Sequence, residues 1–107
     1  MKKDKSFHDY IVHDILEGIP NISSKAMFSG WGIYKNGKIF AIITDGELYF
    51  SARGERGDEV KKYLENLGSH PFAYNRKGKL VTLSYWLAPE ELFENREALY
   101  EFINKYY

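Results

Sequence analysis

Between residues 27 and 50 the chain alternates apolar with small or polar residues in three runs, separated by Asn36-Gly37 and Asp45-Gly46. Asn-Gly and Asp-Gly favour the two-residue type I′ turn, because both of its central residues need a positive φ. The pattern therefore predicts three consecutive antiparallel strands joined by tight hairpins.

A helix is predicted before this meander. Ser6 and Asp9 are spaced like a capping box, and the apolar positions that follow recur every four residues. Gly18 and Pro20 are typical residues for the end of such a helix. A short loop over residues 21–24 then leads into the strands.

Two further helices are predicted after the meander. Asp58 is expected to cap the first, whose apolar residues have the spacing i, i+3, i+4 and i+7, and Gly68 is well placed as its left-handed C-terminal residue. Pro89 can open a helical turn, with acidic residues near the positive end of the helix dipole. Asn95 is the expected cap of the final helix.

A second hairpin is expected between these helices. Residues 72–75 and 80–86 flank a turn at residues 76–79. The element order is then α-β-β-β-α-β-β-α, in a single domain over residues 1–107. Since the helices must cover one face of an antiparallel sheet, the predicted fold class is an α+β two-layer sandwich.

The composition agrees with one packed domain, because 44% of the 107 residues are hydrophobic and 17% are aromatic. The absence of cysteine excludes disulfides and thiolate chemistry and fits a cytoplasmic location. The longest apolar run, residues 39–43, is far shorter than the ~20 residues of a membrane span. The N-terminus lacks the apolar stretch of a signal peptide, so no membrane association is expected.

The formal net charge of zero conceals an asymmetry. Residues 25–57 carry five basic and three acidic groups, and residues 70–86 carry three basic groups and no acidic ones, which sums to +5. The remaining segments carry seven basic and twelve acidic groups, which is −5. Such a domain can bind an anionic surface or a copy of itself, although an unevenly charged, solvated surface is the simpler interpretation.

An ordered set of residues resembles the N-terminal domain of the TfoX/Sxy competence regulators. The set consists of Met27-Phe28-Ser29-Gly30-Trp31-Gly32-Ile33-Tyr34, Asn36-Gly37, Phe40-Ala41, Asp45-Gly46, Leu48-Tyr49, Pro71-Phe72-x-Tyr74, Gly78, Leu83-Ser84-Tyr85-Trp86 and Pro89. The resemblance covers roughly residues 8–106. It implies a fold like that of secretion chaperones and brings no catalytic motif. Full-length regulators carry a further C-terminal domain, so a stand-alone N-terminal domain is expected here.

Two glycine-containing segments are candidate phosphate sites. A phosphate-cradling loop must open a helix, whereas residues 30–32 are followed by strand residues, so close packing or a bulge is the better interpretation. Residues 54–57 do precede a helix and are flanked by Arg53 and Arg56, so an anion could lie there. Two acidic residues at the same helix start would repel it, which favours a plain connection.

No catalytic or metal-binding set can be argued from the sequence. His8 and His13 are five residues apart and would lie on different sides of an α-helix, and His70 stands alone beside a proline. Adjacent carboxylates fall at helix starts, where the dipole explains them. We therefore expect no enzyme activity, no metal and no cofactor.

Aromatic residues gather on the predicted strands. Alternation turns about half of these rings into the core, and the rest form a patch suited to protein partners. The leading prediction is a non-enzymatic regulatory module that binds proteins, forms a homodimer and contacts a further unidentified partner. The expected contact residues are Trp31, Tyr34, Tyr49 and Trp86.

The alternative is a weak nucleic-acid-binding accessory protein. Sheet aromatics can stack on bases while a basic rim follows the phosphates. The candidate anion contacts are Lys35, Lys38, Arg53, Arg56, Arg76, Lys77 and Lys79. A small-molecule site in a cleft near Arg53 and Arg56 is a third hypothesis.

Overall fold

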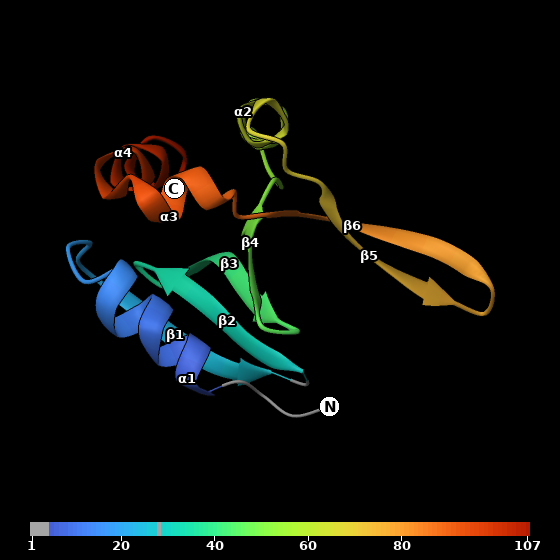
Figure 1. The fold of residues 1–107 in the computed structure, drawn as a ribbon, viewed down its shortest axis with the longest axis horizontal. Coiled ribbons are helices and arrows are strands. Elements are labelled where there is room, and N and C mark those ends of the chain that lie inside the picture. The colour runs from blue at the N-terminus through green and yellow to red at the C-terminus, as the bar shows by residue number, and fades with distance from the viewer. Residues whose placement is uncertain (1–4, 28) are drawn as a thin grey trace.

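The computed structural model describes residues 5–27 and 29–107. Its elements are α1 (Lys5–Asp9), the π-helix η1 (Tyr10–Ile15), β1 (Ile22–Met27), β2 (Gly30–Lys35), β3 (Lys38–Thr44), β4 (Glu47–Ser51), α2 (Gly57–Asn66), β5 (Pro71–Arg76), β6 (Lys79–Leu87), α3 (Glu90–Glu94) and α4 (Arg96–Tyr106). The strands form one antiparallel sheet in the order β1-β2-β3-β4-β6-β5 (Figure 1). The predicted α+β class is confirmed.

The two predicted type I′ turns are confirmed. Asn36 and Gly37 have φ angles of 52° and 81°, and Asp45 and Gly46 have 54° and 73°. Positive φ at both central residues gives the hairpin a twist that matches its strands. These turns fix β2, β3 and β4 as consecutive neighbours in the sheet.

Strand β1 was not expected, since residues 21–24 were predicted to be a loop. From Ile22 onward the chain pairs with β2, in a register that places Ile22 opposite Lys35 and Met27 opposite Gly30. β1 lies at the edge of the sheet and most of its side chains are exposed. An edge strand therefore has little of the apolar alternation by which strands are recognised in a sequence.

The helix ends agree with the sequence in part. Asn95 caps α4 by accepting the N–H of Ala98 at 3.1 Å, and Gly68 has a φ of 86° after α2, as expected. Ser6 and Asp58 do not cap their helices: each lies inside the first turn of its helix, and α2 is preceded by Arg56 without a side-chain cap.

The first helix widens into a π-helical turn. The N–H of Leu16 donates to the carbonyl of Ile11 at 2.9 Å, an i→i+5 bond. A wider turn suits apolar residues spaced by four, because it keeps Ile11 and Ile15 on one side, where both are buried. It also brings the rings of His8 and His13 to 6.2 Å, closer than the expected α-helix would.

Cross-strand pairs divide the sheet into two faces. One row of cross-strand partners runs across β2, β3, β4 and β6 and consists of Ile33, Ala41, Phe50 and Trp86. These side chains are buried against the helices, and only a small part of Trp86 is exposed. The helices lie on this side (Figure 1). The opposite side carries Gly32, Ile42, Tyr49 and Leu87 as successive partners and is termed the open face.

Residues 30–32 lie inside β2, as the packing interpretation predicted. A Cβ added at Gly30 would lie 1.7 Å from the carbonyl oxygen of Ile43, a distance that no side chain tolerates. Gly30 is therefore required for the close approach of β2 to β3. A bulge follows, where Phe40 of β3 is left without a partner between Ile33/Ala41 and Tyr34/Ile39.

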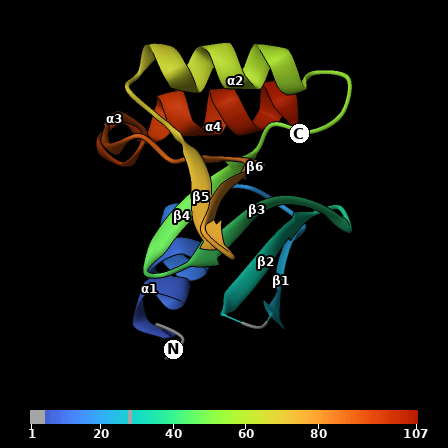
Figure 2. The same cartoon turned by 90° about the vertical axis from the view of Figure 1, so that its right-hand side faces the viewer.

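The hairpin of β5 and β6 extends beyond the body of the domain (Figure 1) and comes toward the viewer in Figure 2. Only residues 85–87 of β6 pair with β4, whereas residues 79–82 pair with β5 alone among the described strands. Residues 72–84 are termed the arm. Lys77 and Gly78 at its tip have φ angles of 51° and 80°, which is the same turn geometry as in the other hairpins.

Candidate functional site

The open face of the meander is lined by apolar side chains around a glycine. A Cβ built on Gly32 would lie 3.0 Å from the sulfur of Met27, 3.1 Å from Ile39 Cδ1 and 3.3 Å from Tyr34 Cε1. The missing side chain therefore lets these three groups close over the strand. The ammonium of Lys25 lies 5.9 Å from the centre of the Tyr34 ring and adds a cation–π contact at the edge.

Tyr49 connects the open face to the arm. Its ring meets the Phe72 ring edge-on at 5.1 Å between centroids, and Phe72 lies 6.2 Å from Tyr74 farther along the arm. Burial, with smaller contributions from Glu47 and Asp45, raises the pKa of Tyr49. A row of aromatic rings therefore connects the sheet to the arm.

This surface collects the exposed apolar groups of the domain. Among the residues that the structure describes, five large hydrophobic side chains are exposed. Four of them lie on the open face or the arm: Met27 at 45%, Tyr74 at 38%, Leu80 at 70% and Leu83 at 38%. Leu80 is the partner of Asn75, so it points to the opposite side of the arm from Tyr74. The fifth, Tyr10 at 44%, lies on η1, on the helix-covered side.

The four predicted contact residues fall on two faces. Tyr34 and Tyr49 lie on the open face, where Tyr34 is half-buried and Tyr49, packed against Phe72, is only 8% exposed. Trp31 lies on the helix-covered side with its ring 4.6 Å from that of His8, and Trp86 is 8% exposed beneath the Lys61 ammonium. The register of the strands, which a single sequence does not reveal, decides this division.

Several apolar side chains of this surface were not among the predicted contact residues. Met27, Ile39 and Ile42 come from the meander, and Phe72, Tyr74, Leu80 and Leu83 come from the arm. Except for β1, which contains Met27, their strands were predicted, but a Leu in a strand is ordinarily assigned to the core. Only the position of the arm outside the body of the domain leaves Leu80 and Leu83 exposed.

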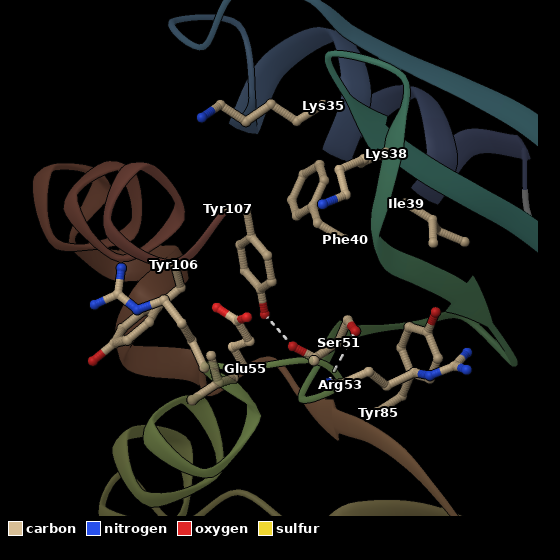
Figure 3. A pocket seen from close by; sticks show the side chains of 13 residues that line it. Lys35, Lys38, Ile39, Phe40, Ser51, Arg53, Glu55, Tyr85, Tyr106 and Tyr107 are labelled. Atoms are coloured by element: carbon tan, nitrogen blue, oxygen red, sulfur yellow. Dashed lines mark hydrogen bonds between the residues drawn. The ribbon is translucent and has the colours of Figure 1, made fainter.

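The seven predicted anion contacts form two separate groups. Arg76, Lys77 and Lys79 lie at the tip of the arm. The other four, Lys35, Lys38, Arg53 and Arg56, line a cavity of about 680 Å³ between the β2–β3 turn and the segment after β4 (Figure 3).

Tyr107 closes one side of this cavity. Its hydroxyl donates to the backbone carbonyl of Ser51, and burial raises the pKa of Tyr107 (Figure 3). The hydroxyl of Ser51 accepts the backbone N–H of Arg53 at 3.3 Å and shapes the start of the connection. The N–H of Gly57 then donates to the carbonyl of Gly54 at 3.1 Å, which turns the chain into α2.

Arg56 is fixed in place, unlike the other cations of the cavity. Its Nε lies 3.2 Å from Glu59, its Nη1 donates to the carbonyl of Lys105, and its guanidinium carbon lies 4.9 Å from the centre of the Tyr106 ring. Arg56 thereby attaches the start of α2 to the end of α4.

The described parts of the chain contain neither a group of metal ligands nor a helix that could span a membrane. Across residues 5–27 and 29–107, no three His, Asp or Glu side chains are grouped so that they could hold a metal ion. Over the same ranges, no helix is long and apolar enough to cross a bilayer. The His8 ring contacts the Ser24 hydroxyl and the Asp9 carboxylate, each at 2.8 Å. The hydrogen bond between His8 and Asp9 lowers the pKa of Asp9.

The antiparallel sheet with helices on one face and a projecting hairpin defines a small two-layer α+β domain. The chain belongs to the TfoX N-terminal domain family, whose family model matches residues 14–107.

Two relatives extend this assignment. The chain is 32% identical over 85 residues to DNA transformation protein TfoX1 of Aliivibrio fischeri, an alignment that covers 79% of this chain and 38% of the relative. It is 27% identical over 90 residues to protein Sxy of Escherichia coli, covering 81% of this chain and 40% of that protein. The chain thus spans about two fifths of the length of these relatives.

Proposed function

We propose that this domain is a non-enzymatic regulatory module that acts through protein–protein contacts. The observation that carries the proposal is the concentration of exposed apolar side chains on the open face and the arm. Contiguous apolar surface of this kind is typical of interaction sites. The relatives, one of them a DNA transformation protein by name, support a competence-related regulatory role. We extend the proposal to transcription and place this role in the cytoplasm.

A second copy of the chain is the partner that we propose for this surface. A two-stranded hairpin is marginally stable by itself, and the arm has no further strand beside it among those described. In a two-fold dimer, the arm of each copy can lie across the open face of the other, because an isologous interface uses the same patch twice. About 800 Å² of buried surface per copy is enough for a stable dimer.

Sedimentation equilibrium with a matched pair of variants tests this proposal. Tyr74→Glu places a charge on the arm, and Tyr10→Glu makes the same change at a similarly exposed tyrosine on η1. We expect Tyr74→Glu to weaken dimerisation at least tenfold, about 1.4 kcal/mol, and Tyr10→Glu to leave it unchanged. A wild-type protein that stays monomeric at ~100 μM would refute the dimer. A dimer with a dissociation constant of that size is held together by roughly 5 kcal/mol.

Nucleic-acid binding through the arm is the second candidate function. Arg76 pairs directly with Lys79 at the tip, Lys77 lies in the turn between them, and residues 70–86 contain no acidic group. A two-stranded ribbon of this kind has the dimensions to enter the major groove of a duplex.

Salt dependence tests this second candidate. Fluorescent single- and double-stranded oligonucleotides are titrated at ~50 and ~200 mM salt, where affinity from phosphate contacts falls steeply. The double variant Lys77→Glu/Lys79→Glu should abolish binding. The control Lys61→Glu/Lys62→Glu makes the same charge change on α2, away from the arm, and should leave binding in place. Binding that survives the arm variant would disprove the assignment.

A further inference from the structure

We propose that the cavity beside Tyr107 binds a mononucleotide, that is, a small molecule with both a phosphate and a planar base. This site adjoins the open face, since Ile39 lines both, but the proposal does not depend on the proposed dimer. The cavity has a volume of about 680 Å³, within the range of roughly 300–1,000 Å³ that is usual for small-ligand sites.

The cavity exists because β3 and β4 separate at one end. Their pairing runs from Thr44/Glu47 at the turn only as far as Ala41/Phe50, after which β4 continues alongside β6 with Ser51 opposite Tyr85. The bulge at Phe40 turns the start of β3 away, and the Tyr107 hydroxyl, rather than a strand, satisfies the Ser51 carbonyl. The opening is therefore built into the strand register and does not depend on a mobile loop.

Three cations are available to a phosphate at this opening. Lys35 and Lys38 come from the β2–β3 hairpin and Arg53 from the segment after β4 (Figure 3). Within the described residues, none of the three makes an ion pair. In Figure 3 the Lys35 and Arg53 side chains extend to opposite sides of the cavity, with Lys38 between them, so we place the phosphate against Lys38 and one of these two neighbours. Unpaired Lys and Arg side chains are the usual recognition chemistry for phosphate.

Aromatic rings line the same cavity and favour a ligand with a planar base. The buried ring of Phe40 lies 5.3 Å from that of Tyr107, and Tyr85 and Tyr106 complete the aromatic wall. Phe40 and Tyr85 are buried, so a base would stack against the half-buried rings of Tyr106 and Tyr107, an interaction that any base can make. Glu55, which extends into the same space (Figure 3), would repel phosphate but can accept an amino or ring N–H group of a base.

The cations, aromatic rings and carboxylate of the cavity together favour a mononucleotide over simpler ligands. A bare phosphate would leave the aromatic wall unused, and an apolar ring would leave three cations unused. A nucleic-acid strand would be expected at the tip of the arm, where the other basic group lies. A mononucleotide uses the cations, the rings and the carboxylate together.

Isothermal titration calorimetry and amide NMR on the wild-type protein test this inference. The probes are AMP, GMP, CMP and UMP, with adenosine, guanosine and inorganic phosphate as the separate halves. We expect at least one mononucleotide to bind with a Kd below ~1 mM, about −4 kcal/mol, and more tightly than either half. The shifted amides should include Gly54 and Tyr107.

A matched pair of variants locates the site. Lys38→Gln/Arg53→Gln should weaken binding at least tenfold, whereas Lys77→Gln/Lys79→Gln, which removes the same charge from the arm, should not. Amide spectra of each variant report whether it is folded. No saturable binding to the folded wild type at ~10 mM nucleotide, equal binding of inorganic phosphate, or shifts confined to the arm would each overturn the proposal.

Discussion

The Tyr107 side chain shows how a single residue completes the core at the separated end of β3 and β4. Its ring contacts those of Phe40, Phe50 and Phe102, and its hydroxyl satisfies a carbonyl that no neighbouring strand reaches. A strand end that would otherwise be unsatisfied is thereby paired. The same ring forms a wall of the cavity.

Replacing Tyr107 by Phe should lower the free energy of unfolding by about 1 kcal/mol at pH 7, because one hydrogen bond is lost while the ring is kept. The pKa of Tyr107 is raised in the folded state, so its contribution is fully present below the unfolded pKa of about 10. It is lost as the pH rises above that value, where the unfolded phenol ionises.

Urea unfolding at several pH values between about 7 and 11 measures this effect. The difference between the wild type and Tyr107→Phe should narrow above about pH 10, and Tyr10→Phe, at an exposed position, should show no such change. The pKa values of Tyr49 and Tyr63 are also raised, but both proteins retain these residues, so their effects cancel in the difference between the two unfolding free energies. A difference that stays constant with pH would contradict the account of Tyr107.

At the scale of the element, helix α4 illustrates what a local signal determines. Asn95 ends α3 and caps α4, so one side chain fixes the bend between two helices that together cover part of the core. The buried residues Leu99, Phe102 and Ile103 then face the sheet. Without the cap, the first N–H groups of α4 would lose a partner.

Replacing Asn95 by Ala should lower the free energy of unfolding by about 1 kcal/mol. The matched variant Asn104→Ala lies at an exposed position within α4, where alanine is the better helix former, so it should be neutral or slightly stabilising. Thermal and urea unfolding of the two variants give the comparison. Equal effects at both positions would show that the cap contributes nothing.

Local signals of this kind explain which elements could be predicted. The Asn-Gly and Asp-Gly turns, the cap at Asn95 and the glycine after α2 each depend on neighbouring residues alone, and all are confirmed. β1 could not be recognised, because its stability comes from pairing with β2 and its own side chains are mostly exposed. The π-helical turn and the pairing of β4 with β6 likewise depend on distant parts of the chain.

For the candidate sites, the residue types were predictable but their grouping was not. The sequence identifies the cations, yet only the fold separates the arm tip from the cavity. Tyr34 and Trp31 are close in the chain but point to opposite faces, since successive residues of a strand alternate. A bulge or a shift of one residue in register would exchange the two faces.

At the scale of the whole molecule, the two faces of the sheet have different surroundings. One face is sealed by helices that carry most of the acidic residues, and the other is left to apolar and basic side chains. The arm extends that second surface away from the body (Figures 1 and 2). This division is what leads us to expect that a second copy covers the open face.

An intermolecular nuclear Overhauser experiment tests that expectation most directly. The chain has two methionines, and Met27 lies on the open face, so labelling methionine methyl groups in one half of a mixed sample reports on this surface with little overlap. We predict transfer from the labelled Met27 methyl group to Tyr, Phe or Leu protons of an unlabelled copy, and its loss in Tyr74→Glu. Transfer confined to protons of the same copy, under conditions where sedimentation detects a dimer, would show that the open face is not the interface.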